Sequence, residues 1–184
     1  MNRSDALILL HEYTKSDSLR KHALAVEAAM RAYARKFGED EEKWGITGLL
    51  HDFDYEMYPQ VPDHPEKGSE ILASHGYPDD VRTAILGHVP QMNVPRESKM
   101  AKTLFACDEL AGFIVACAMV RPNKLNDLQP SSVKKKLKDK AFARTVNRED
   151  IQQGIVEMEL NIDDHIVLIT GALAAIADDL GLKA

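Results

Sequence analysis

The sequence predicts an all-α protein, and two features of the chain carry that prediction. Apolar residues recur at spacings of three and four throughout the 184 residues, whereas the alternation of apolar and polar residues that marks a strand is nearly absent. Residues that favour helix starts and ends also stand where these periodic segments begin and stop. An apolar content of 45% and a charged content of 28% are ordinary for a globular protein, so we expect a packed helical core.

The first helices are bounded by residues with strong capping preferences. Ser16 or Asp17 can cap a helix that runs to about Phe37, where Gly38 ends it. Another helix starts near Asp40 and carries four residues on one face: Trp44, Thr47, Gly48 and His51. We expect His51 on the buried side of this helix and Asp52 at its end.

A loop over residues 52–63 follows, because this segment holds two prolines and no helical pattern. Asp63 can then cap a helix over residues 64–75 with Gly76 as its C-cap, and a further helix runs over about residues 78–88.

A long apolar helix over about residues 98–119 precedes the one plausible linker, residues 123–130. Beyond the linker Ser131 can cap a short basic helix, and Asn147 or Asn161 can cap later helices. The last helix carries a continuous apolar stripe: Ile162, Ile166, Ile169, Leu173, Ile176 and Leu180.

The chain shows no internal repeat and no low-complexity tract. We therefore expect one domain over residues 1–184. Its core would span about residues 17–119, and a C-terminal helical extension over about residues 128–182 would pack against that core.

Composition narrows the class of protein. A formal charge of -6 argues against a nucleic-acid binder that uses its whole surface. Cys107 and Cys117 lie ten residues apart, which fits neither a zinc pair nor a redox pair, so we expect reduced core cysteines. The first ten residues lack the apolar run of a signal peptide, and no run of about 18 apolar residues exists. The expected protein is cytoplasmic, with no membrane contact.

Four ionisable residues stand where apolar residues are expected. His22 lies on the inner stripe of its helix, His51 and Asp52 follow two leucines, and Asp108 interrupts a long apolar run. A lone buried carboxylate would cost several kcal/mol unless it is paired or bound to a metal. Imidazole and carboxylate groups together suit zinc, manganese, iron, nickel or cobalt, so these residues predict a divalent-metal site.

In order, helical placement and approximate spacing, these four residues resemble the HD superfamily of metal-dependent phosphohydrolases. The resemblance covers about residues 18–118, and the adjacent His51 and Asp52 are its most specific part. It implies a bundle of five or more helices with a metal at its centre and with His22, His51, Asp52 and Asp108 as ligands.

Two more histidines resemble the branch of this superfamily that holds a second metal. There His64 and His88 would bind the second ion, with Asp52 bridging. The chain departs from many relatives of that branch in two places. It has one histidine at His88 rather than a pair, and Phe53 and Asp54 follow the His-Asp pair. We therefore expect one or two divalent ions per chain.

Several residues have expected roles in chemistry. Asp52 would bind metal and orient the attacking water, while Lys67, together with Arg20 or Lys21, would neutralise phosphate charge. Asp54 could be a general acid or base, a group that supports a ligand, or a plain loop carboxylate.

The predicted function is a metal-dependent phosphohydrolase that acts on a phosphate mono- or diester, such as a nucleotide or a small phosphorylated metabolite. Two alternatives stay open. One is a di-iron oxygenase, because proteins resembling myo-inositol oxygenase use the same ligand set. The other is a non-catalytic, metal-stabilised sensor or binding module. The sequence leaves the substrate, the physiological metal and the oligomeric state open.

Overall fold

The computed structural model describes residues 2–184, and those residues form ten α-helices, one 3₁₀ helix and no strand. The all-α prediction is confirmed. In chain order the elements are α1 (Arg3–Tyr13), α2 (Asp17–Phe37), α3 (Glu41–Leu49), α4 (Asp63–Ser74), α5 (Asp79–Gly87), η1 (Pro90–Met92), α6 (Lys99–Met119), α7 (Pro130–Leu137), α8 (Arg148–Glu157), α9 (Ile162–Ala175) and α10 (Ala177–Leu180).

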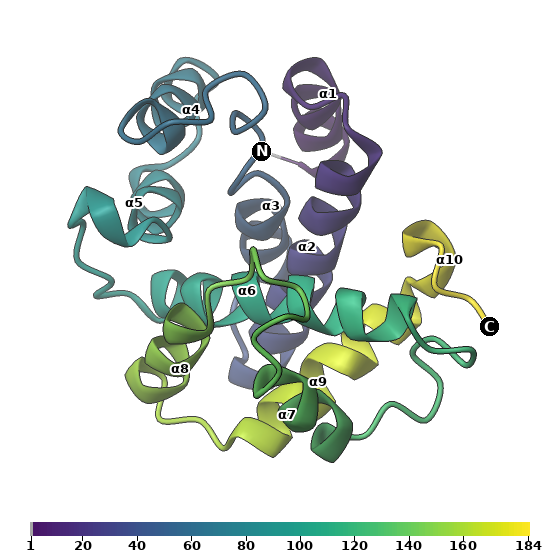
Figure 1. Cartoon of the computed structure of the whole chain (residues 1–184). Coiled ribbons are helices and arrows are strands. Elements are labelled where there is room, and N and C mark those ends of the chain that lie inside the picture. The colour runs from purple at the N-terminus through teal and green to yellow at the C-terminus, as the bar shows by residue number, and fades with distance from the viewer. Residues whose placement is uncertain (1) are drawn as a thin grey trace.

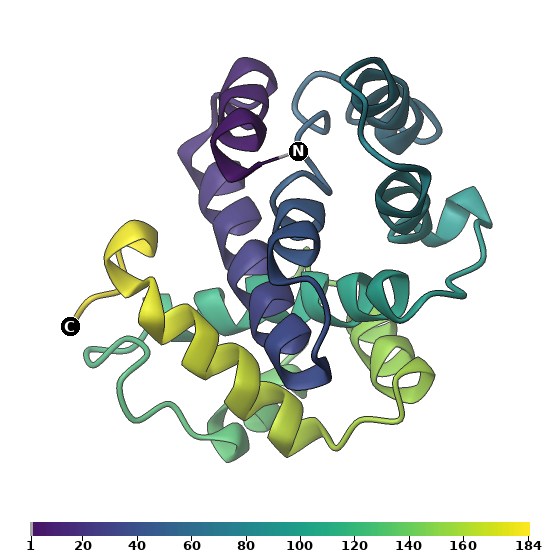
Figure 2. The same ribbon diagram turned by 180° about the vertical axis from the view of Figure 1, so that it is seen from behind.

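Helix α6 crosses the middle of the molecule and divides it into two parts (Figure 1). Helices α1 to α5 lie mainly on one side of α6, and α7, α8 and α9 lie on the other. From behind, α9 lies beside the lower part of α2, and the two helices are in contact (Figure 2). None of the helices in the described residues has both the length and the apolar content needed to cross a bilayer.

The contact between α2 and α3 is close because a glycine faces α2. Ser16 caps α2 by accepting a hydrogen bond from the amide of Leu19, and Gly38 ends the helix at φ 70°, where glycine is favoured. A Cβ atom at Gly48 would lie 2.9 Å from the carbonyl oxygen of Val26. Any larger residue at position 48 would push the helices apart, and with them the turn that follows α3.

Two helix boundaries differ from the sequence-based predictions. Helix α3 ends at Leu49, so His51 and Asp52 lie in the turn after the helix rather than on its face. The prediction that Asp63 caps the next helix is wrong. Asp63 is the first residue assigned to α4 and makes no capping hydrogen bond, and His64 has non-helical backbone angles. The pair of prolines at positions 62 and 65 restricts this segment and makes the start of α4 irregular.

The C-terminal helices are capped largely as predicted, but two boundaries are corrected. Asn147 and Asn161 both accept hydrogen bonds at the starts of α8 and α9. Helix α7 starts at Pro130, before the predicted cap Ser131. The last apolar stripe is broken at Ile176, whose φ of -119° separates α9 from α10.

The C-terminal segment shares its buried apolar residues with the rest of the protein. Ile166, Ile169 and Leu173 are fully buried in the same cluster as the inner residues of α2 and α6. Within this cluster Nδ1 of His165 accepts from the Tyr33 hydroxyl at 2.6 Å, and its Nε2 atom donates to the carbonyl oxygen of Ala106 at 2.9 Å. Helix α9 is thereby fixed to both α2 and α6.

Candidate metal centre

Six side chains from five separate segments meet beside α6. His22 comes from α2, His51 and Asp52 from the turn after α3, His64 from the first turn of α4, His88 from the C-cap of α5, and Asp108 from the middle of α6. These are the six residues that the sequence singled out as metal ligands, and the structure brings all of them together.

Three of these residues and one oxygen of Asp52 form a first group. The Nε2 atoms of His22 and His51 lie 2.9 Å and 3.3 Å from Asp108 Oδ1. Oδ2 of Asp52 lies 3.5 Å from the Nε2 atom of His51. Ligand atoms that share one ion at bond lengths near 2.1 Å lie roughly 3.0–3.4 Å apart, so the separations of His22 and His51 from Asp108 fit a common metal ion. Oδ2 of Asp52 lies farther from His22, at 3.9 Å from its Nε2 atom.

The other oxygen of Asp52 faces a second group. Oδ1 of Asp52 lies 3.2 Å from the Nε2 atom of His64 and 3.1 Å from the Nε2 atom of His88. The two oxygens of one carboxylate therefore point into two different sets of imidazole nitrogens. This is the arrangement that a carboxylate bridging two ions requires.

The Nδ1 atoms of His51 and His88 are held by hydrogen bonds to backbone carbonyl oxygens, which direct the Nε2 atoms toward the carboxylates of the cluster. Nδ1 of His51 donates to the carbonyl oxygen of Gly48 at 2.7 Å, and Nδ1 of His88 donates to that of Ile85 at 2.5 Å. The Nε2 atom of His51 is buried and makes no well-directed hydrogen bond, although Asp108 lies nearby. A buried nitrogen without a partner is costly, and a metal ion would satisfy it.

Asp54 supports His64 instead of lining the cavity. Its carboxylate is fully buried, accepting from Nδ1 of His64 at 2.9 Å and from the amide of Gly68 at 2.8 Å. A Cβ atom at Gly68 would lie 2.6 Å from the carboxyl carbon of Asp54, so this contact requires glycine. Since Nδ1 and Nε2 stand on different sides of the ring, Asp54 orients His64 toward Asp52.

The electrostatics of the metal-free cluster reflect close contact between carboxylates and imidazoles. Burial lowers the pKa of His51, but Asp52 and Asp108 outweigh it and raise that pKa to about 10. For His64 burial again opposes the carboxylates, and Asp52 and Asp54 raise the pKa to about 9. Burial raises the pKa of Asp52, but the surrounding histidines hold it well below its usual range. The imidazoles thus replace the positive charge that a metal ion would supply.

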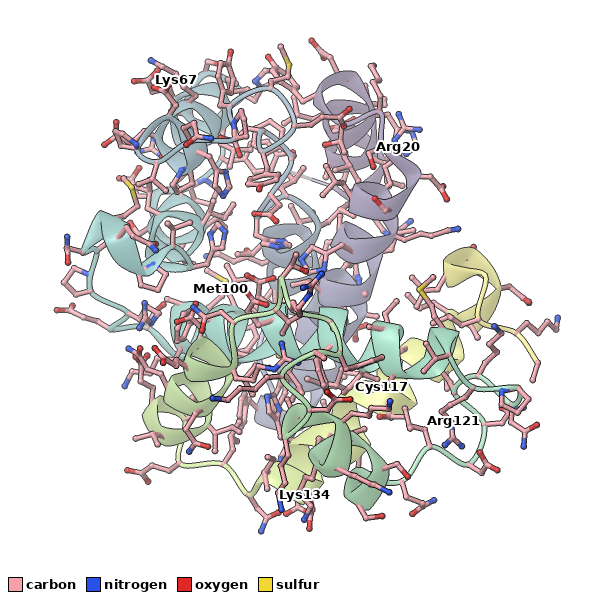
Figure 3. The ribbon with its side chains drawn as sticks, viewed as in Figure 1. Arg20, Lys67, Met100, Cys117, Arg121 and Lys134 are labelled. Carbon is pink, nitrogen blue, oxygen red and sulfur yellow. The ribbon has the colours of Figure 1, made fainter. Side chains whose placement is uncertain are left out.

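The cluster opens into a cavity of about 1080 Å³, which has room for an organic ligand as well as a phosphate group. Lys21 lines this cavity and forms an ion pair with Asp17 at 2.8 Å. The structure does not bring Lys67 or Arg20 there. Lys67 pairs with Glu70 on the exposed side of α4, and Arg20 donates to the carbonyl oxygen of Thr14 (Figure 3). The expectation that Lys67 contacts the phosphate is therefore corrected, because Lys67 does not line the cavity.

One cavity residue escaped the sequence-based reasoning. Glu109 follows Asp108 and lines the same cavity, where its carboxylate accepts from the amide of Asn147 at 3.1 Å. Burial and the charge of Asp108 raise the pKa of Glu109 to about 7. Its place next to a predicted ligand was the only signal in the sequence, and that signal does not distinguish a cavity residue from a surface one.

Comparison with known proteins gives one family match and one relative. The model of the HD domain family matches residues 19–112, about half of the chain. A ribonuclease Y of Oleidesulfovibrio alaskensis is 27% identical over 121 residues, which cover 65% of this chain and 22% of the relative. The chain thus spans about a fifth of the length of that relative. No solved structure shows significant similarity to the chain.

Proposed function

This chain belongs to the HD domain family, and on that premise we propose that it is a metal-dependent phosphohydrolase acting on a phosphate mono- or diester. The substrate would be a small phosphorylated molecule, such as a nucleotide or another metabolite. The similarity to a ribonuclease Y supports phosphoester chemistry in general. It does not define a substrate, since the matched region is a small part of that protein.

The observation that carries the proposal is the double orientation of Asp52. Its Oδ2 atom faces His22 and His51, which also stand beside Asp108, and its Oδ1 atom faces His64 and His88. These residues would hold one ion in the first group and a second ion in the other, from among manganese, iron, zinc, nickel and cobalt. A bound divalent ion would supply Lewis-acid polarisation of the phosphoryl oxygens and lower the pKa of water toward neutrality.

The protein's own residues would bind and orient the substrate. Lys21 stands on the cavity wall one residue before His22, and its ammonium group pairs with Asp17 and lies beside Gly181, so it would attract an anionic group that enters the cavity. Asp54 is a positioning residue, because it fixes the ring of His64 without reaching the cavity. Asp52 would hold His51 on one side and His64 and His88 on the other through its two carboxylate oxygens. This set accounts for binding and alignment without a nucleophilic side chain.

The test combines metal content with activity. Protein purified without chelator should contain about two divalent ions per chain, and His64→Ala should retain about one. A panel of phosphate mono- and diesters should be hydrolysed by wild type and by His75→Ala, a control whose exposed histidine lies outside the cluster.

Three outcomes would count against the proposal. A metal-loaded protein without phosphoester hydrolysis would refute it, as would a protein that binds no divalent ion. Bound iron with oxygen-dependent loss of an organic substrate would instead establish the oxygenase alternative.

A further inference from the structure

The cavity extends well beyond the metal-ligating cluster along one face of α6. Gly112, Val115, Ala116 and Met119 line it after Asp108, at the spacing of a single helix face. Met119 lies eleven residues after Asp108, so at 1.5 Å per residue the cavity continues for about 16 Å along the helix. A phosphate group held at the cluster would occupy only the near end of this space.

The far stretch of the cavity carries apolar side chains from several elements, with Lys124 beside Met119 and Lys21 beside Gly181 at its edge. Val146, from the connection between α7 and α8, faces it, and Leu180 and Leu182 close it at the carboxyl end of α6. In Figure 1 the connection between α7 and α8 lies in front of α6, and α10 lies beside the carboxyl end of α6. We name this stretch, lined by Val115, Ala116, Met119, Val146, Leu180 and Leu182, the α6 groove.

Two features make the α6 groove a binding surface continuous with the cluster. At Gly112, where the groove leaves the cluster, there is no side chain, and a Cβ atom would lie in ordinary contact with Nδ1 of His22, at 3.5 Å. At its far end Met119 lines the cavity and is 63% exposed. An exposed apolar surface that joins a polar centre suits a ligand with one anionic end and one apolar end.

From this geometry we propose that the substrate is a phosphate ester of an elongated apolar alcohol, whose apolar part lies in the α6 groove. The inference rests on the proposed phosphohydrolase function and names its substrate class. Hydrolysis would break the bond between phosphorus and the alcohol oxygen. Water would supply the new oxygen on phosphorus and the proton on the released alcohol.

The experiment measures hydrolysis of methyl, butyl and octyl phosphate, with adenosine monophosphate as a polar comparison, by metal-loaded wild type. We expect kcat/KM to rise along the alkyl series, by up to about fourfold for each methylene that leaves water, and octyl phosphate to exceed adenosine monophosphate. Ala116→Leu places three extra carbon atoms about 12 Å along the helix from Asp108. It should lower the ratio of octyl to methyl kcat/KM at least tenfold.

Two further variants keep the test specific. Met119→Ser changes an exposed residue, so it should fold normally and lower the octyl to butyl ratio. Val167→Leu lies on the exposed face of α9, outside the groove, and should leave both ratios unchanged. A kcat/KM that is independent of chain length, or a preference for adenosine monophosphate, would overturn the groove assignment while leaving the hydrolase proposal intact.

A binding measurement separates failure of the groove from failure of the function. Octyl phosphate titrated into metal-loaded protein should bind with a negative heat-capacity change, and Ala116→Leu should weaken that binding. If octyl phosphate binds in this way but no ester is hydrolysed, the groove stands and the hydrolase function fails. If octyl phosphate binds no better than methyl phosphate, the groove proposal fails.

Discussion

The two halves of the metal-ligating cluster rest on different kinds of backbone. His22 and Asp108 lie within α2 and α6, two regular helices of 21 residues each that pack against one another. His64 has non-helical angles at the start of α4, and His88 is the C-cap of α5. Helix packing fixes His22 and Asp108, whereas single hydrogen bonds at irregular backbone fix His64 and His88. We therefore expect the second half to be the more easily perturbed.

The largest effect should come from the residue that belongs to both halves. Asp52→Asn removes the charge that faces both sets of histidines, so we expect loss of both ions and about a 10³-fold fall in kcat/KM. Metal analysis and phosphoester kinetics check this. Retention of both ions with near-normal activity would show that Asp52 does not bridge the two halves.

Asp54→Ala should damage the second half alone. The carboxylate that orients His64 is lost, and the amide of Gly68 is left without a partner. We expect a 10–100-fold weaker affinity for one ion and a loss of about 1–3 kcal/mol of stability. Metal titration and denaturant unfolding measure these changes. An equal loss of both ions would contradict the independence of the two halves.

The stability of the metal-free protein and its affinity for metal should change with pH in opposite directions. In the metal-free protein the pKa values of His51 and His64 are raised to about 10 and 9. The stability that these groups contribute is therefore fully present below their unfolded pKa and is lost as pH rises from about 6.5 toward 9–10.

Metal binding must displace those protons, so affinity should increase by up to about tenfold per pH unit for each proton released. Unfolding curves of the metal-free protein and chelator competition between pH 6 and 9 test both signs. A metal affinity that does not change with pH would mean that the histidines are neutral before the ion binds.

The smallest expected effect is a change in KM, and it distinguishes Lys21 from Lys67. Lys21 lines the cavity, whereas Lys67 pairs with Glu70 outside it. We expect Lys21→Ala to raise KM about tenfold, the value of one charge-assisted hydrogen bond, and Lys67→Ala to leave KM within twofold of wild type. Steady-state kinetics on one soluble phosphoester is sufficient. A larger effect at Lys67 would restore the role that its sequence position suggested.

Much of the fold could be predicted because the relevant forces are local. The start of α2 at Ser16 and its end at Gly38 follow from capping preferences, and Asn147 and Asn161 cap α8 and α9 for the same reason. The start of α4 was mispredicted. There the backbone around two prolines overrides the capping preference of Asp63.

The residues of the candidate site were visible in the sequence because burial makes them conspicuous. His22 and Asp108 stand on apolar helix faces, where an ionisable group needs a partner. The sequence left Asp54 open among three roles, since its carboxylate is defined by contacts with His64 and Gly68 across a loop. The position of Lys67 was missed because one turn along a helix does not determine which way a side chain faces.

The sequence by itself determined the helical class and the chemical types of the six clustered residues, because periodicity and the cost of buried charge are properties of short segments. Only the tertiary structure decided that the two oxygens of Asp52 face different histidines, that Lys21 rather than Lys67 enters the cavity, and that the cavity continues along α6. These features depend on the directions of side chains carried by segments far apart in the chain. Those directions are fixed only when the helices pack.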